Sequence, residues 1–213
     1  MKGKIIYRGI AVAAGTLLMS AAFAGPTGLI VMPIADILGH REVNFQVAVA
    51  GNERNVDKGH YWAQSVEFGL YDVMEVGYDN DFLGNTVLNA KFLLYQSKGA
   101  GKFLVSGGLQ NVGLFDSQPD KYIVGRYDMK SCRLHAGCIY NDRFRGMVGI
   151  DAPLPKGWSI AADYVSGPGA YAWTQLTIPL PVAGFSLGLA GGLPIDHENG
   201  IKHQISLSYD HKF

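Results

Sequence analysis

The residues of this chain best suited to chemistry are six scattered histidines and a recurring set of acids and bases. The histidines are His40, His60, His135, His197, His203 and His211. No Gly-x-Ser-x-Gly turn or His-Glu-x-x-His helix accompanies them, and no His or Cys spacing matches a metal site. A histidine such as His135 beside a serine would be the one arrangement to consider for hydrolysis, but a polar interior explains it equally well. We therefore predict no catalytic residue, no cofactor, no metal site and no enzyme.

The acids and bases share one property, which is that each lies on the polar side of an alternating segment. With His135, these residues are Glu67, Glu75, Asp79, Lys91, Arg126, Asp128, Arg133, Asp151 and Asp163. Because both signs of charge are present, the side chains either pair and close the space between them or line a narrow aqueous path. We predict that they line the lumen of the fold.

Alternation with a period of two defines the elements that carry these side chains. Apolar residues fill every second position from Val43 to Val49 and again near the C-terminus, and twelve such segments follow one another from Val43 onward. Their polar faces hold Gly, Ala, Ser and Asn with few charges, whereas the solvated face of a soluble β-sandwich should be rich in Lys and Glu. The pattern favours a membrane barrel, with a soluble sandwich or soluble barrel as the alternative.

The connections support an up-and-down arrangement. Alternate connections are mostly longer and polar, as in "GNERNVDKG" and "LPIDHENG", while those between them are mostly tight, as in "LYD" and "MKSC". Bacterial outer-membrane barrels have short turns at the periplasmic rim and longer loops outside. We therefore predict an all-β fold: a transmembrane antiparallel up-and-down β-barrel of about 12 strands over residues 42–213, closed by the C-terminal strand.

The C-terminus ends abruptly within a strand, on an aromatic residue. In a closed barrel the last strand pairs with the first, so no unpaired edge remains. A terminal aromatic after alternating apolar residues also resembles the signal read by the outer-membrane barrel assembly machinery. The residues in the expected places are Ile205, Leu207, Tyr209 and Phe213, while His211 stands where an aromatic or aliphatic residue is usual.

The N-terminus carries a different signal. Residues 1–24 combine a basic start, a short apolar run and Ala22-Phe-Ala24, which is typical of a cleaved signal peptide. An uncleaved anchor helix is less favoured because the run is shorter than the ~20 apolar residues that a spanning helix needs. Residues 25–41 follow as an apolar stretch interrupted by Pro33, and we expect an extended plug at the periplasmic mouth or an additional strand.

That stretch also resembles a known family. Gly25-Pro-Thr-Gly-Leu29, followed by Met32-Pro33 and Ala35-Asp36, is similar to the start of YjbH-type proteins, which are outer-membrane barrels associated with exopolysaccharide production. The resemblance covers about 14 residues, and members of that family are typically much longer. It implies a barrel related to polysaccharide secretion, and it brings no enzymatic residues with it.

Composition limits the partners. Lys plus Arg number 18 and Asp plus Glu number 18, so the formal net charge is zero and nucleic acid is not an expected partner. Cys132 and Cys138 would lie ~20 Å apart within one strand, too far for a disulfide. We expect apolar fillers or free thiols there, although a turn near Cys132 would permit a bridge, and an intermolecular link is the other alternative.

Two functional classes fit these patterns. The first is a porin-like channel or export conduit for small polar solutes or polysaccharide, located in the outer membrane of a diderm bacterium. The second is a non-conducting barrel that anchors or stabilises an envelope or surface assembly. The expected partners are outer-membrane lipids and the barrel assembly machinery, together with a second copy of the chain or an envelope protein.

Overall fold

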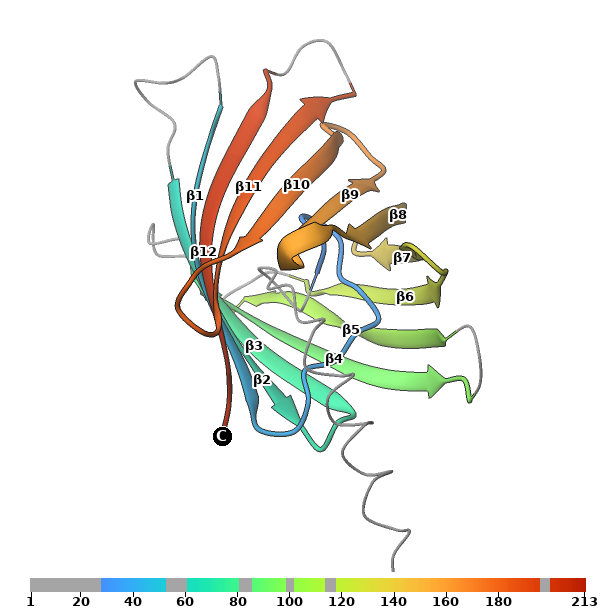
Figure 1. The fold of residues 1–213 in the computed structure, drawn as a ribbon. Helices are drawn as coiled ribbons and strands as arrows, with labels where there is room; N and C mark the ends of the chain where they lie inside the picture. The colour runs from blue at the N-terminus through green and yellow to red at the C-terminus, as the bar shows by residue number, and fades with distance from the viewer. Residues whose placement is uncertain (1–27, 53–60, 81–85, 99–101, 114–117, 196–199) are drawn as a thin grey trace, which may run out of the picture.

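The computed structural model describes residues 28–52, 61–80, 86–98, 102–113, 118–195 and 200–213. The strands form one closed antiparallel barrel, in which neighbours in sequence pair and the first strand pairs with the last (Figure 1). They are β1 (Glu42–Asn52), β2 (Tyr61–Leu70), β3 (Met74–Asn80), β4 (Thr86–Gln96), β5 (Phe103–Gly113), β6 (Asp120–Asp128), β7 (Arg133–Tyr140), β8 (Phe144–Pro153), β9 (Ser159–Val165), β10 (Tyr171–Pro179), β11 (Phe185–Pro194) and β12 (Lys202–Lys212). The prediction of a twelve-strand barrel is therefore confirmed.

The contact between β1 and β12 closes the barrel along the full length of both strands. The register pairs Glu42 with Lys212 at one end and Asn52 with Lys202 at the other. At the shared rim the backbone N–H of Phe213 donates to the carbonyl of Arg41 at 3.0 Å. The strand that ends the sequence is thus paired on both sides, because β11 covers its other edge.

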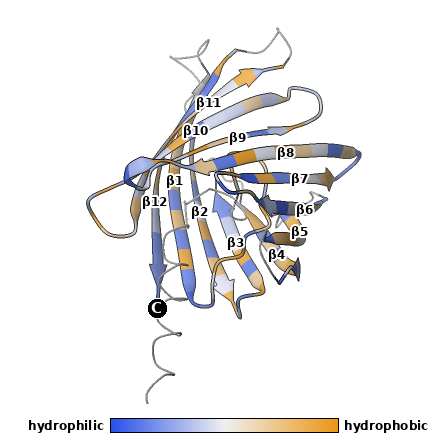
Figure 2. Ribbon diagram, turned by 45° about the vertical axis from the view of Figure 1, so that its right-hand side comes forward, coloured by the Kyte–Doolittle hydropathy of each residue, from blue (hydrophilic) through white to orange (hydrophobic). Residues whose placement is uncertain are grey.

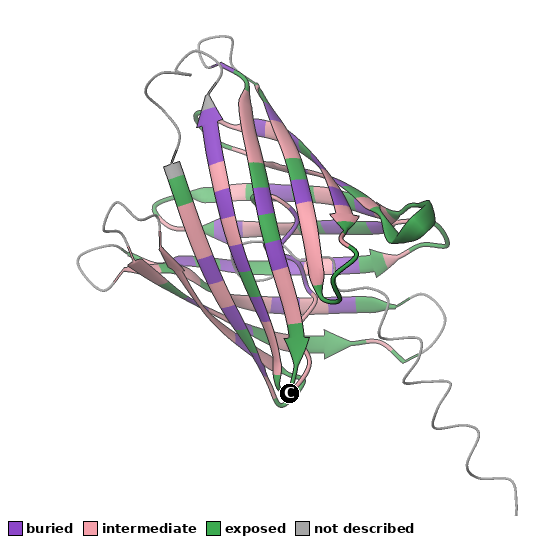
Figure 3. Ribbon diagram, turned by 60° about the vertical axis from the view of Figure 1, so that its left-hand side comes forward, coloured by how far each residue is buried: buried purple, intermediate pink, exposed green. Residues whose placement is uncertain are grey.

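The two faces of the wall differ sharply in exposure. On β12, Ile205 and Leu207 point outward and are 53% and 43% exposed, whereas Ser206 and Ser208 between them are each 2% exposed. The same alternation of apolar and polar residues, and of exposed and buried ones, runs along the strands around the barrel (Figures 2 and 3). An apolar exterior of this kind, around a polar interior, is the surface that a lipid-embedded barrel presents.

The pairing of β4 with β5 is irregular at two places, between Leu88 and Ala90 and between Leu93 and Tyr95. At the second place the face of β4 changes. Tyr95 consequently lies on the outside and is exposed, next to Phe103. A strict period of two would place Tyr95 on the polar face together with Lys91, and the bulge is the reason that this is wrong.

Exposed aromatic residues gather at the rim that holds both ends of the barrel. They are Tyr71, Tyr95, Phe103, Tyr127, Trp158 and Phe213, all in or beside the turns of that rim. Aromatic girdles mark the membrane–water interfaces of outer-membrane barrels, so this rim has the composition of one interface. A 3₁₀ turn, η2 (Pro155–Gly157), joins β8 to β9 at the same rim.

The two sets of connections differ less in length than the sequence suggests. The longest connections by sequence, eight residues between β1 and β2 and seven between β11 and β12, join strand ends at the rim opposite the chain ends, called the far rim. However, six residues join β4 to β5 across strand ends of the near rim, where the chain ends lie, and six also join β5 to β6 across strand ends of the far rim. Cys132 belongs to a near-rim turn and Cys138 faces outward on β7, and both are free thiols.

Residues 28–41, named the inner segment here, run inside the barrel (Figure 1). A single antiparallel bridge joins Gly28 to Pro33, and the segment adds no strand to the wall. Its apolar side chains pack on inward residues of β5 to β9 in one buried cluster.

The signal-peptide prediction for residues 1–24 lies outside the described residues. No helix among the described residues is long and apolar enough to span a membrane.

Candidate functional site

The lumen and the inner segment inside it form the candidate site. Asp163 of β9 points inward and contacts the tip of the inner segment. Its Oδ2 atom accepts hydrogen bonds from three consecutive backbone N–H groups, those of Ile30 at 2.7 Å, Val31 at 2.8 Å and Met32 at 3.1 Å. A carboxylate surrounded in this way fixes the conformation of the tip of the segment, since charge-assisted hydrogen bonds are the strong ones.

An apolar surface on the wall receives the same tip. Leu29 and Met32 are buried against inward residues such as Val124, Ile139 and Met147. The wall is hollowed at Gly149, where a Cβ atom would collide with the Leu29 side chain and come within 2.8 Å of the Met32 sulfur. The seat is therefore shaped by a residue without a side chain, and a larger residue there would displace Leu29 and Met32.

Apolar side chains in a barrel lumen are the part of the site that sequence reasoning missed. Tyr122, Val124, Ile139 and Met147 occupy inward positions, where polar residues are expected. The available signal was the weaker alternation of these strands, in which both faces of β6 carry apolar residues. Those departures mark the surface on which the inner segment packs.

Asp36 links the middle of the inner segment to the basic residues of the wall. Its carboxylate forms ion pairs with Arg126 of β6 and, at 3.6 Å, with Arg133 of β7. Close by, the Ser106 hydroxyl of β5 donates to the carbonyl oxygen of Ala35 at 2.6 Å. The segment is thus held by side chains of neighbouring strands through both its backbone and its one acidic side chain.

The two arginines are themselves held by acids on the wall. Arg126 pairs with Asp128 at 2.7 Å, and Arg133 pairs with Asp151 at 2.6 Å. The second carboxylate oxygen of Asp151 lies 2.7 Å from Nε2 of His135. Five of the residues predicted to line the lumen therefore belong to one network, and His135 is a hydrogen-bond partner within it.

A second charged cluster lies on β2 to β4. Lys91, which is 0% exposed, contacts Glu75 at 3.2 Å. The other Glu75 oxygen accepts the backbone N–H of Leu38, so this cluster also touches the inner segment. Glu67 is buried at an inward position of β2, and Asp79 accepts a hydrogen bond from Asn89 at 2.7 Å. All ten residues predicted to line the lumen thus lie at inward positions, and nine of them make the ion pairs or hydrogen bonds described above.

The remaining wall, made by β10, β11, β12 and β1, is polar without being charged at mid-height. The Gln46 amide donates to the Ser208 hydroxyl at 3.0 Å, and the Gln175 amide donates to Thr177 at 3.1 Å. These side chains are also buried. The lumen therefore has a charged side covered by the inner segment and a neutral polar side, and the inward side chains at this level are closed off from water.

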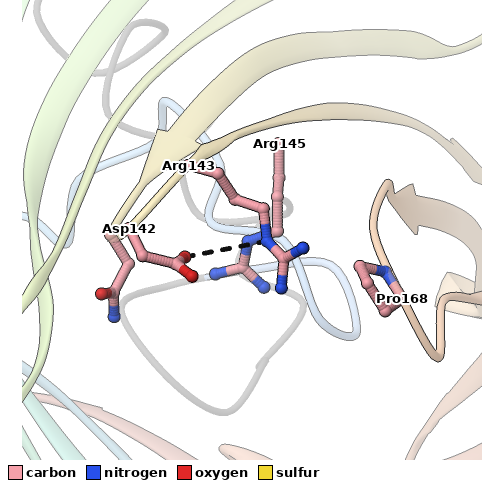
Figure 4. A pocket seen from close by; sticks show the side chains of 5 residues that line it. Asp142, Arg143, Arg145 and Pro168 are labelled. Carbon is pink, nitrogen blue, oxygen red and sulfur yellow. Dashed lines mark ion pairs between the residues drawn. The ribbon is translucent and has the colours of Figure 1, made fainter.

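An open pocket of about 290 Å³ lies at the far rim. Asn141, Asp142, Arg143, Arg145 and Pro168 line it, and Figure 4 shows the ion pair of Asp142 with Arg143. Arg145 also approaches Asp120 at 3.6 Å. Within the described residues, no cluster of three or more His, Cys, Asp or Glu side chains is arranged to hold a metal ion.

The other histidines are dispersed. His40 stacks on Tyr71 and His211 stacks on Tyr209, both at the near rim. His203 lies on the outward face of β12, and His60 and His197 lie outside the described residues. Among the described histidines, only His135 belongs to the lumen network.

Comparison with known proteins supports the fold. No protein-family model and no curated protein sequence matches the chain. Among solved structures, a KdgM porin in complex with disordered oligogalacturonate aligns with a TM-score of 0.57 at 10% identity, over 79% of this chain and 98% of that one. A second KdgM porin structure aligns with a TM-score of 0.55 at 10% identity, over the same shares of the two chains. The chain is therefore similar in fold to outer-membrane barrel channels.

Proposed function

We propose that the protein is a porin-like channel of the bacterial outer membrane, which passes small polar solutes and is closed by its inner segment acting as a plug. The apolar exterior, the aromatic rim and the likeness in fold to porins support the location. The observation that carries the proposal is the mismatch inside the barrel. A polar and charged lumen is lined for water, yet a separate stretch of chain covers its charged side, partly through ion pairs and hydrogen bonds that water can replace.

The direct test removes the plug and measures conductance. A variant lacking residues 28–38, folded in detergent and inserted in planar bilayers, should show discrete single-channel currents, while the intact protein stays mostly closed. Heat-modifiable gel mobility must first show that both barrels are folded. A folded variant that conducts no better than the intact protein would reject the channel and favour the non-conducting barrel that anchors an envelope assembly.

A second candidate function concerns the solute. The similarity of residues 25–36 to the start of YjbH-type proteins supports a role in polysaccharide export, with the barrel as a conduit. Deleting the gene in a host that makes an exopolysaccharide should then lower the secreted polymer without lowering its synthesis inside the cell. Unchanged secretion would leave the small-solute channel as the better proposal.

We also propose that the C-terminal strand serves as the signal for barrel assembly. Phe213 is largely exposed at the near rim, packed edge-on against His211, and its ring adds little to the core. Deleting Phe213 removes at most about 1.5–3 kcal/mol of burial, which a closed barrel can tolerate. The truncated protein should therefore reach the outer membrane poorly, yet refold in detergent with nearly unchanged thermal stability.

The matched control for this prediction is Phe144→Ala, which removes an equally exposed aromatic residue at the opposite rim. It should leave outer-membrane levels unchanged. Normal amounts of the truncated protein in the outer membrane would show that Phe213 is only part of the wall and not an assembly signal. Failure of the truncated protein to refold in detergent would show that the role of Phe213 is structural.

A further inference from the structure

The two arginines of the lumen network converge on a single carboxylate. Arg126 directs Nε and Nη2 to the two oxygens of Asp128, at 2.7 and 2.9 Å, and its free edge, Nη1, meets Asp36 Oδ1. Arg133 directs Nε and Nη2 to Asp151, at 2.8 and 2.6 Å, and its Nη1 lies 3.6 Å from Asp36 Oδ2. Each guanidinium thus faces a different oxygen of the same carboxylate, in direct contact for Arg126 and at ion-pair distance for Arg133.

The wall itself holds both guanidinium groups. Asp128 and Asp151 hold the two guanidinium planes, and His135 in turn holds Asp151. Arg126 and Arg133 are buried, and the adjacent strands β6 and β7 set their spacing. A pair of donors that is already oriented binds an anion without the cost of ordering two long side chains.

Asp36 differs from the other members of the network because it does not belong to the wall. The inner segment has further anchors, at Asp163, Ser106 and Glu75, that do not involve Asp36. Two of the wall's acids already balance its two arginines, so Asp36 adds a carboxylate that charge balance does not require. It occupies the position that a carboxylate from outside the wall would take.

We propose that Arg126 and Arg133 form a binding site for the carboxylate of a solute in the lumen, and that Asp36 is the built-in occupant with which this solute competes. The inference deepens the proposed channel function and rests on it, since the solute must be able to enter the lumen. A carboxylate fits better than a neutral sugar because both guanidinium groups are charged and face the two oxygens of one carboxylate.

Binding can be measured without any conductance. Radiolabelled glucuronate is dialysed to equilibrium against detergent-folded protein, with glucose as the neutral counterpart. Asp36→Asn removes the competing charge and should bind glucuronate about tenfold more tightly than the unchanged protein, or about 1.4 kcal/mol. Adding Arg133→Gln to Asp36→Asn should abolish this gain, and Asp142→Asn, which removes an exposed acid at the far rim, should have no effect.

The outcomes separate the two proposals. Equal glucuronate affinity in the unchanged protein and in Asp36→Asn, or a gain that survives Arg133→Gln, overturns the carboxylate site. Equal binding of glucose overturns it too, and full displacement of glucuronate by sulfate makes the site a general oxyanion site instead. If Asp36→Asn does not fold, Asp36→Ser takes its place. Glucuronate binding by a barrel that never conducts would retain the site and reject the channel.

Discussion

Replacing Asp163 by Ala is expected to raise the open probability of the channel by about tenfold or more in planar bilayers. The carboxylate accepts three backbone N–H groups from the tip of the inner segment, and the nearby apolar wall cannot replace it as an acceptor. Each hydrogen bond to a charged group contributes roughly 1.5–3 kcal/mol. The free energy lost with the three hydrogen bonds therefore exceeds about 1.4 kcal/mol, which corresponds to a tenfold change in an equilibrium constant.

A second substitution tests the same seat from its apolar side. Gly149→Phe fills the hollow under Leu29 and Met32, so the segment can no longer lie against the wall and the channel should open as well. Asp142→Ala, at the exposed far-rim loop, is the control for loss of an acid and should behave as the unchanged protein. If both Asp163→Ala and Gly149→Phe fold and stay closed, the inner segment is a permanent part of the core.

Leu207→Arg is expected to destabilise the folded barrel by about 2–4 kcal/mol in lipid vesicles, as measured by denaturant unfolding. Leu207 lies near the middle of β12 on the outward face, where an arginine would meet the hydrocarbon core. Phe92→Arg, near the middle of β4 on the same face, should have a similar cost. The size of this free-energy cost follows from placing a charged side chain where water is absent.

The control belongs to the same strand and the same face. His211→Arg lies at the end of β12 near the interface, where the cost should fall to about 0–1 kcal/mol. An inward control at Gly108 is unsuitable, because a Cβ atom there would meet the Tyr122 ring at 2.8 Å. Equal costs at Leu207 and His211 would contradict a membrane-embedded wall and support a soluble barrel.

The sequence by itself determined the number of strands, the face of nearly every side chain and the closure by the last strand. All three follow from a period of two, because one register slip would move a whole apolar face into the lumen. The inward position of residues such as Glu75, Arg126 and Asp163 follows from the same rule. The bulge before Tyr95 escaped it, since the run from Phe92 to Tyr95 contains no charged residue that would reveal the change of face.

Only the tertiary structure decided which inward groups meet. The pairing of Arg133 with Asp151 depends on the register of β7 against β8, and Asp36 reaches Arg126 across 90 positions of sequence. Alternation describes one strand at a time and contains no information about such contacts. The seat at Gly149 was equally invisible, because a glycine that makes room for Leu29 looks the same in sequence as a glycine in any strand. The path of the inner segment is set by the space and the donors that the closed wall leaves inside it.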